Sequence, residues 1–414
     1  MQPLNYMKKS FLFLLLLAVC AYPNKVFAGG FLIYGHDAAA LALGLAYTAQ
    51  VKNPSAVLYN PAAINQIEGT SFSIGGTLIN SHVSFRVDST GNKTNQDSDL
   101  FFIPAFFATK KLNDRWSIGI GSFSPYGLTS NWPGDWDGRY LATFAQLRSF
   151  FLNPVVSCQL TPKLSFAGGF NIVYSDVYQR KNIKITPFRD GGAKFKGDDF
   201  GWGYNIGLLY QITDKFKFGA AYRSTIRMDY VGDVTFRVPK LIESIVPEGR
   251  ANINIDLPGF LTTGLCYSPN KKWSIEFDVF WIDWSQYDSL DLKYSKPVRA
   301  IMRKQAAPIV RDYHDTYDFC LGVSYRATET ITLRAGYLFD ESPVPEKSQD
   351  PILYDADKHF YSLGIGLQKG KWTVDIAGYL CFYEDQNISR NQDKFNGKFK
   401  AFLNTLALSI TYAL

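Results

Sequence analysis

The sequence predicts an all-β membrane protein, a 14-stranded antiparallel transmembrane β-barrel that is plugged by a small N-terminal hatch. Three observations support this fold class: a secretion signal, long stretches in which bulky apolar residues alternate with small or polar ones, and connections that are short and long in turn. The chain is 46% hydrophobic, yet its mean hydropathy is only −0.10. Such a composition is typical of strands that turn one face to lipid and the other to water.

Residues 1–28 have the features of a signal peptide. A basic segment containing Lys8 and Lys9 precedes an apolar run at 11–19, and small residues up to Ala28 form a cleavage site. The signal starts at Met1 or at Met7. Because three of the 43 basic residues lie in the signal, the mature chain has 40 of them against 37 acidic ones, a formal charge of +3. This near balance argues against a nucleic acid as the partner.

The region 70–414 is predicted to form the barrel, with strands of period two. In the last strand Leu406, Leu408 and Ile410 alternate with small or polar residues. The predicted strands cover residues 70–87, 99–109, 115–123, 149–160, 163–175, 200–212, 215–230, 255–267, 272–283, 313–326, 330–339, 359–368, 371–382 and 402–414. Short connections alternate with long ones such as 176–199 and 231–254, which is the pattern of outer-membrane barrels. Because the number of predicted strands is even, both termini are expected on the periplasmic side.

The segment 29–69 lies between the signal and the first strand, and we predict that it is the hatch. From residue 29 to 65 it carries only two charged residues, Asp37 and Lys52, and it is rich in alanine and leucine. A barrel of about fourteen strands is too wide for its own side chains to fill. We therefore expect this segment to fold inside the lumen, with Asp37 as the N-cap of helical structure over 37–50.

Several motifs resemble the FadL/TodX family of outer-membrane transporters for long-chain fatty acids and other hydrophobic compounds. The sequence Asn60-Pro61-Ala62 is similar to the motif that ends the hatch of this family. Further similarity follows in order along the chain, at 125–128 (PYGL), 136–140 (WDGRY), 218–224 (FGAAYRS), 280–285 (FWIDWS) and 333–337 (LRAGY). The resemblance covers essentially the whole mature chain.

This resemblance implies a monomeric, hatch-closed barrel in the bacterial outer membrane that takes up hydrophobic compounds by ligand-gated passive diffusion. A ligand would bind first among the outer loops and then in an inner pocket. It would leave sideways into the membrane lipid through an inward kink of the third strand. The residues assigned in this way are Gly29, Gly30, Phe31, Leu32 and Ile33 at the pocket, Asn60, Pro61 and Ala62 at the end of the hatch, and Gly119, Gly121, Ser124 and Pro125 at the kink.

Two further sets of residues are candidates for ligand contact. Apolar residues in predicted loops would line an outer hydrophobic groove, or alternatively pack the loops against each other: Trp132, Trp136, Tyr140, Leu241, Ile242 and Ile245. By strand alternation Lys217, Arg223 and Arg334 point inward, where a cation would bind a fatty-acid carboxylate. The same cations would alternatively pair with inward acids such as Glu276 and Asp278.

The sequence predicts no enzyme, no cofactor and no metal. It contains four histidines, and it has no hydrolase, metalloprotease or phosphate-binding motif. Two substrate classes stay open, long-chain fatty acids and aromatic hydrocarbons. The alternative functions are a general porin, a loop-mediated adhesin or phage receptor and, more remotely, an outer-membrane lipid hydrolase.

Overall fold

The computed structural model describes residues 30–97, 100–186, 189–297 and 308–414. The predicted signal peptide and Gly29 lie outside the described residues. Within them the chain forms an all-β antiparallel barrel of fourteen wall strands, which confirms the predicted fold class. The barrel closes because β1 pairs with β22 along its whole length, from Ser71–Ala413 to Val87–Gly397. None of the helices among these residues is long and apolar enough to cross a membrane.

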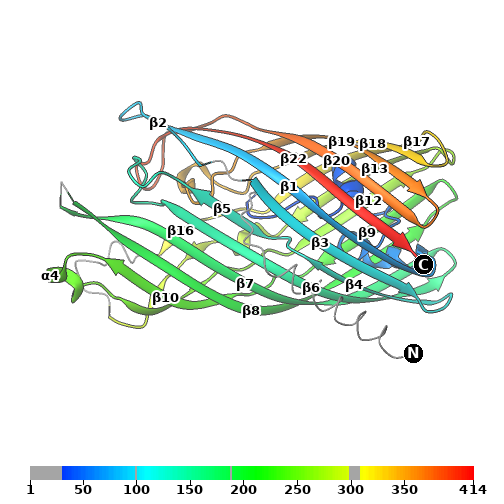
Figure 1. The fold of residues 1–414 in the computed structure, drawn as a ribbon, viewed down its shortest axis with the longest axis horizontal. Helices are drawn as coiled ribbons and strands as arrows, with labels where there is room; N and C mark the ends of the chain where they lie inside the picture. The colour runs from blue at the N-terminus through cyan, green and yellow to red at the C-terminus, as the bar shows by residue number, and fades with distance from the viewer. Residues whose placement is uncertain (1–29, 98–99, 187–188, 298–307) are drawn as a thin grey trace, which may run out of the picture.

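The wall is built of strands that are continuous or divided into two pieces (Figure 1). The continuous wall strands are β1 (Thr70–Val87), β3 (Leu100–Lys111), β6 (Phe144–Thr161), β7 (Leu164–Thr186), β8 (Arg189–Gln211), β13 (Trp273–Ile282), β17 (Thr316–Arg326), β18 (Ile331–Asp340), β19 (Lys358–Lys369), β20 (Trp372–Tyr383) and β22 (Gly397–Ala413). The divided ones are β4 with β5 (Trp116–Phe123, Gly127–Asn131), β9 with β10 (Phe216–Arg223, Asp229–Arg237) and β11 with β12 (Gly249–Asn254, Phe260–Tyr267). Short strands in the loops are β2 (Lys93–Asn95), β14 (Ser289–Leu290), β15 (Lys293–Tyr294), β16 (Ile309–Val310) and β21 (Gln386–Ile388).

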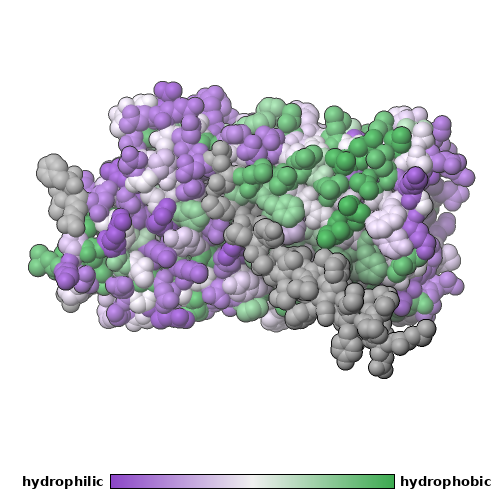
Figure 2. Space-filling model, viewed as in Figure 1, coloured by the Kyte–Doolittle hydropathy of each residue, from purple (hydrophilic) through white to green (hydrophobic). Residues whose placement is uncertain are grey.

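Alternation along the strands separates an apolar outer face from a small, polar inner face. On β1, Phe72 and Ile74 are exposed, whereas Ser71, Ser73 and Thr77 are buried in the lumen. Figure 2 shows the apolar surface over the half of the molecule that carries the C-terminus, while the long hairpins at the other end are mostly hydrophilic. The half with short turns therefore spans the membrane, and the hairpins extend beyond it.

Three predicted loops contain wall strands in the structure. The loop predicted between the strands 115–123 and 149–160 contains β5 and the first residues of β6. The segment 176–199 continues β7 and β8 in a ladder up to Thr186–Arg189, and β10 and β11 occupy much of 231–254. Polar side chains interrupt the apolar pattern there, but the backbone hydrogen bonds continue above the membrane. The strand predicted over 215–230 is interrupted after Arg223. A short helix, α4 (Lys240–Glu243), ends this part of the molecule.

The described residues before β1 fill the lumen at the short-turn end. They form α2 (Ala38–Ala42), α3 (Ala56–Tyr59) and the 3-10 helix η1 (Pro61–Gln66). Asp37 caps α2 by accepting a hydrogen bond from the backbone N–H of Ala40 at 3.1 Å, as predicted, although the helix is shorter than the expected 37–50. The wall adapts to this filling, because a Cβ at Gly336 would lie 2.1 Å from the backbone nitrogen of Gly44.

Candidate functional site

The first described residues of the hatch cross the lumen as an extended segment, residues 30–35, which we call the terminal segment. Phe31, Leu32 and Ile33 are all buried, with at most 4% of their surface exposed. The ring of Phe31 lies edge-on to Trp284 and Tyr287, with centroid distances of 4.9 and 5.4 Å. Three residues that the sequence assigned to an inner pocket are thus packed in the centre of the barrel.

The terminal segment pairs with the interruption between β4 and β5. Ile33 donates its backbone N–H to the carbonyl of Pro125, and Gly127 donates to the carbonyl of Phe31, both at 2.8 Å. These bonds make Leu32 and Tyr126 an antiparallel bridge pair. The phenol of Tyr126 crosses the lumen and donates to the carbonyl of Pro258. The hatch therefore contacts the wall at the point where a wall strand is broken.

This interruption contains one residue more than a regular strand. β4 pairs Phe123 with Phe151, whereas β5 pairs Gly127 with Arg148. The chain thus advances four residues opposite three on β6, which is the count of a β-bulge. Ser124 and Pro125 lie within this bulge, and Gly119 and Gly121 lie in β4 against Val57 of the hatch.

The bulge separates β5 from β3 and leaves what we call the wall gap. The ladder between β3 and β4 ends at Phe106–Ser122, while β3 stays paired with β1 up to Leu100. Among the described residues, β5 forms a ladder with β6 and none with β3. Asn131 closes the upper end, because its carbonyl accepts a hydrogen bond from the Asp97 N–H at 3.0 Å. Residues 100–105 of β3 therefore face β5 without strand pairing.

A small apolar cavity lies beside the terminal segment. Its volume is about 40 Å³. This is far below the several hundred Å³ typical of ligand pockets. Its lining comes from the hatch, from the bulge and from β12 and β13: Leu32, Ile33, Tyr34, Gly35, His36, Leu45, Thr48, Leu58, Tyr59, Pro125, Phe260, Thr262 and Phe280. A ligand of any size fits here only if the terminal segment moves.

Carboxylates of the wall and of the loop before β19 hold the terminal segment. Tyr34 donates its hydroxyl to Asp318 at 2.7 Å, and the backbone N–H of Gly30 donates to Asp355 at 3.2 Å. The ammonium of Lys358 lies 2.5 Å from Asp355 and 3.3 Å from a third carboxylate, that of Asp340. All of these side chains are buried, and Lys358 is the cation that pairs with two of the three carboxylates.

Two other inward acids bind the hatch backbone. Asp278 accepts hydrogen bonds from the N–H groups of Tyr47 and Thr48, both at 3.0 Å. Glu276 accepts one from Ala49 at 2.6 Å. Both carboxylates therefore accept hydrogen bonds from backbone N–H groups of the hatch. Among the described residues neither acid forms an ion pair with a lumen cation, but Arg334 pairs with another inward acid, Asp375, as the alternative expected.

The three predicted lumen cations have different surroundings. Lys217 donates to Gln66 of the hatch at 2.9 Å, and Arg334 forms an ion pair with Asp375 at 2.7 Å. Arg223 is buried and contacts asparagine side chains rather than a carboxylate. The hatch motif lies nearby, where Asn60 donates to the carbonyls of Thr48 and Leu208 at 2.9 and 3.0 Å.

The predicted outer-groove residues do not come together as one surface. Trp132 and Trp136 are buried and stacked on each other, with ring centroids 4.1 Å apart. Tyr140 donates to Asp190 at 2.7 Å. Leu241 is 90% exposed on α4, a helix without buried residues, and it is followed by Ile242 and Ile245. The two tryptophans thus pack the loops against each other, which was the alternative to an outer groove.

A different apolar pocket lies among the extended hairpins. It has a volume of about 60 Å³, and it is lined by Gln179, Lys181, Ala193, Lys194, Phe195, Val234, Ile253, Leu290, Leu292, Tyr294 and Ile309. The sequence analysis missed these residues because it read 176–199 and 231–254 as loops. The signal was present as alternation, since Ala193 and Phe195, or Ala251 and Ile253, are two residues apart.

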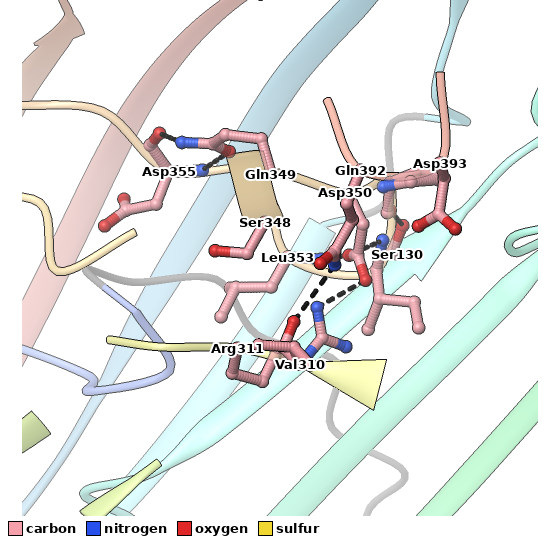
Figure 3. Close-up of polar contacts among 12 residues, drawn as sticks. Ser130, Val310, Arg311, Ser348, Gln349, Asp350, Leu353, Asp355, Gln392 and Asp393 are labelled. Atoms are coloured by element: carbon pink, nitrogen blue, oxygen red, sulfur yellow. Dashed lines mark hydrogen bonds and ion pairs between the residues drawn. The ribbon is translucent and has the colours of Figure 1, made fainter. Parts of the chain in front are cut away.

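The outer loops are tied to one another above the lumen (Figure 3). Arg311 and Asp350 form a buried ion pair, and Ser130 donates to the carbonyl of Pro351 at 2.5 Å. Gln392 joins a further loop by donating to the carbonyl of Val310 at 3.0 Å. Burial acts to lower the pKa of Arg311, but Asp350 and two neighbouring tyrosines raise this pKa above its usual value, so the guanidinium stays charged.

The fold and this arrangement define a class of protein, an outer-membrane β-barrel closed by its own N-terminal segment. The family model of "Outer membrane protein transport protein (OMPP1/FadL/TodX)" matches residues 19–414, and the chain belongs to this family. The family consists of non-enzymatic transport proteins, which confirms the prediction that the chain is not an enzyme.

Individual relatives are distant but match over nearly the whole chain. The "Long-chain fatty acid transport protein" of Salmonella typhi is 23% identical over 94% of this chain and 95% of its own length. Among solved structures, a Pseudomonas aeruginosa FadL homologue has a TM-score of 0.83 at 21% identity, covering 92% of this chain and 99% of the homologue. The Ralstonia pickettii toluene transporter TbuX has a TM-score of 0.72 at 18% identity, covering 94% and 100%.

Proposed function

We propose that this chain takes up hydrophobic compounds across the outer membrane, either long-chain fatty acids or aromatic hydrocarbons, by ligand-gated passive diffusion with lateral exit through the wall gap. One observation carries the proposal: the terminal segment is hydrogen-bonded to the bulge that separates β5 from β3. A ligand that displaces this segment acts on the cavity and the wall gap together. The relatives include transporters named for both substrate classes.

Capture takes place on the extracellular side. The pocket among the extended hairpins offers apolar side chains, with Lys181 and Lys194 at the same place. Burial of a hydrophobic molecule there is favourable by about 25 cal/mol of free energy for each Å² of apolar surface removed from water. This pocket, rather than Trp132 and Trp136, is the surface that receives the ligand first.

Passage requires the terminal segment to move. The cavity of about 40 Å³ beside it is too small for a fatty acid or for toluene. A ligand that enters from above replaces the contacts of Phe31 with Trp284 and Tyr287 and separates Leu32 from Tyr126. The terminal segment is in equilibrium between its closed and displaced positions. Only a ligand that binds the displaced state better than the closed state shifts this equilibrium, so the ligand itself opens the barrel.

Exit leads into the membrane. Ala105 and Ile103 on β3 face the lumen, whereas Leu100 and Phe102 are exposed on the outer face, so the unpaired part of β3 is apolar on both sides. A hydrophobic ligand leaves between β3 and β5 without crossing a polar layer. We further infer that the protein acts as a monomer, and that the C-terminus is periplasmic because it lies at the rim with the short turns.

The proposal is tested by removing residues 29–33 from the mature chain. Uptake of radiolabelled oleate and of toluene by expressing cells is expected to fall at least about tenfold, since the ligand then lacks the apolar contacts that couple its binding to opening. Assembly is followed by the heat-dependent mobility of the folded barrel on gels. Phe31→Ala is a milder variant, and Phe72→Ala, which makes the same change on the outer face, is its control.

Two outcomes would contradict the proposal. Unchanged uptake by the assembled deletion variant would remove the terminal segment from the mechanism. A large unit conductance of the intact protein in planar bilayers, with entry of small sugars, would favour a general porin, because a hatch-closed lumen conducts little.

A further inference from the structure

Three cations lie side by side on the outer face of the β7–β8 hairpin. Arg180 of β7 and Lys194 of β8 are direct cross-strand partners, and Lys196 follows two residues further along β8, opposite Tyr178. All three cationic residues are exposed, whereas Phe195 between the two lysines is buried on the inner face. Because residues two apart point to the same side of a strand, the three cations share one surface. We call them the cationic face.

The cationic face stands above an aromatic band at the edge of the membrane. Tyr174 and Phe200 are cross-strand partners with ring centroids 5.0 Å apart, and Phe200 and Trp202 are 71% and 70% exposed. Such residues mark the interface between hydrocarbon and head groups. Lys196 and Lys194 lie roughly 10–16 Å above Phe200 if the strands tilt by about 40°. In Figure 1 β7 and β8 continue to the end of the molecule opposite the C-terminus, so the cationic face lies at the height of the outer-leaflet head groups.

The cations of this face lack carboxylate partners. None of the three forms an ion pair with another residue that the structure describes. The acids around them are engaged by other arginines, because Arg148 binds Asp176 at 2.8 Å. Arg250 lies 3.7 Å from Asp233, the cross-strand partner of Lys196 on β10. The positive charge of the face is therefore not compensated by the neighbouring strands.

Aromatic rings hold two of these cations against the wall. The Lys194 ammonium lies 5.2 Å from the ring centroid of Tyr178, and the Arg180 guanidinium carbon lies 5.8 Å from that of Phe144. Contacts of this kind position a cation without neutralising it. Within the described part of the hairpin, three positive charges thus meet one remaining carboxylate, that of Asp198. This surplus favours an anionic partner.

We propose that the cationic face binds the phosphate groups of the glycolipid that forms the outer leaflet of the bacterial outer membrane. The head group of this lipid is a phosphorylated sugar, and its acyl chains lie along the apolar wall beside Phe200 and Trp202. Arg180 offers a planar fork of donors to a phosphate, and the two lysines offer point charges. Clusters of lysine and arginine beside the hydrocarbon layer recognise anionic lipid head groups in this way. The inference does not depend on which compound the barrel transports.

The test measures how tightly two glycolipid probes bind to the purified full-length mature protein in detergent micelles. The probes are diphosphoryl lipid A and the same lipid without its phosphates. The intact protein should bind the phosphorylated probe at least about tenfold more tightly. The triple variant Arg180→Gln, Lys194→Gln and Lys196→Gln should lose this preference, because each cation near a membrane surface changes affinity by roughly fivefold. The dephosphorylated probe should bind both proteins within about twofold.

A matched control removes three exposed cations from the short turns at the opposite rim, Lys163→Gln, Lys271→Gln and Lys371→Gln, with the same change in net charge. It should keep the affinity of the intact protein. If the triple variant does not assemble, Lys194→Gln and Lys196→Gln alone should each weaken binding of the phosphorylated probe severalfold. Equal affinity of the intact protein for the two probes, or an unchanged preference in the assembled triple variant, would overturn the inference. Binding of dioleoylphosphatidylglycerol as tight as that of diphosphoryl lipid A would also overturn it, because the face would then attract any anionic lipid.

Discussion

The β7–β8 hairpin and the β3–β4–β5 region belong to the same wall but differ in how they are paired. β7 and β8 form a ladder from Leu164–Tyr210 to Thr186–Arg189, with its irregularity only at the far end. β3 loses its partner at Ser122, halfway along the strand, where the bulge turns the chain into the lumen. The ladder between β7 and β8 is regular over most of its length, whereas the interrupted one is the place where the hatch is hydrogen-bonded to the wall.

Deleting Pro125 tests most directly whether the interrupted wall is needed for uptake. The deletion removes the one extra residue opposite β6, so Ser124 and Tyr126 would continue the ladder and β5 would come into pairing distance of β3. We expect uptake of oleate or toluene by cells to fall at least about tenfold, close to background, because the wall gap closes. The matched control deletes Ile185, the extra residue at the irregular end of the β7–β8 ladder, and should leave uptake unchanged. Normal uptake by an assembled Pro125 deletion would contradict lateral exit.

The next largest effect is expected from Tyr34→Phe, which loosens the hatch on the side opposite the bulge. The variant removes a buried hydrogen bond from Tyr34 to Asp318. Bonds to a charged acceptor contribute about 1.5–3 kcal/mol, so the displaced state of the terminal segment should be populated roughly tenfold more. Ion conductance in planar bilayers is expected to rise accordingly. Tyr210→Phe on the lipid face is the control, and equal conductance of the two variants would remove Tyr34 from the gate.

A somewhat smaller effect is expected from Gly336→Ala, which tests how closely the rigid wall fits the hatch. The added Cβ would lie 2.1 Å from the backbone of Gly44, so the hatch must shift. Overpacking of this kind costs about 1–3 kcal/mol. We expect faster cleavage of the hatch by protease in the assembled barrel. Gly168→Ala adds the same methyl group where nothing lies within 4 Å, and should be indistinguishable from the original protein.

Much of the wall could be predicted from the sequence, because apolar residues must alternate with small or polar ones along a lipid-facing strand, and the end of this alternation is visible in the sequence. The bulge could not be found in this way. The third strand was predicted to end at residue 123 and a loop to follow, so β5 and the one-residue insertion before it were missed, and only the family resemblance placed a kink there. Outside the membrane the alternation weakens, and 176–199 was therefore taken for a loop although its backbone pairing continues.

The lumen cations show a second reason why site prediction was incomplete. Alternation correctly turns Lys217, Arg223 and Arg334 inward, but it does not give their partners. Those partners are remote in sequence: Asp375 is 41 residues from Arg334 and Gln66 is 151 residues from Lys217. Whether a buried charge is compensated is a property of the closed barrel. The difference between Arg223 and the other two therefore emerged only from the structure.

The smallest predicted effect tests whether the bulge is held by the opposite wall. Tyr126→Phe removes the hydrogen bond from the phenol to the carbonyl of Pro258 and keeps the ring beside Phe31. A neutral hydrogen bond contributes about 0.5–1.5 kcal/mol, so the closed state should be weakened by only a few-fold, with a small rise in conductance. Tyr361→Phe, on the exposed outer face of β19, is the control. If Tyr126→Phe instead abolished uptake, the phenol would contact the ligand directly, and the bulge would be part of the binding site as well as of the exit.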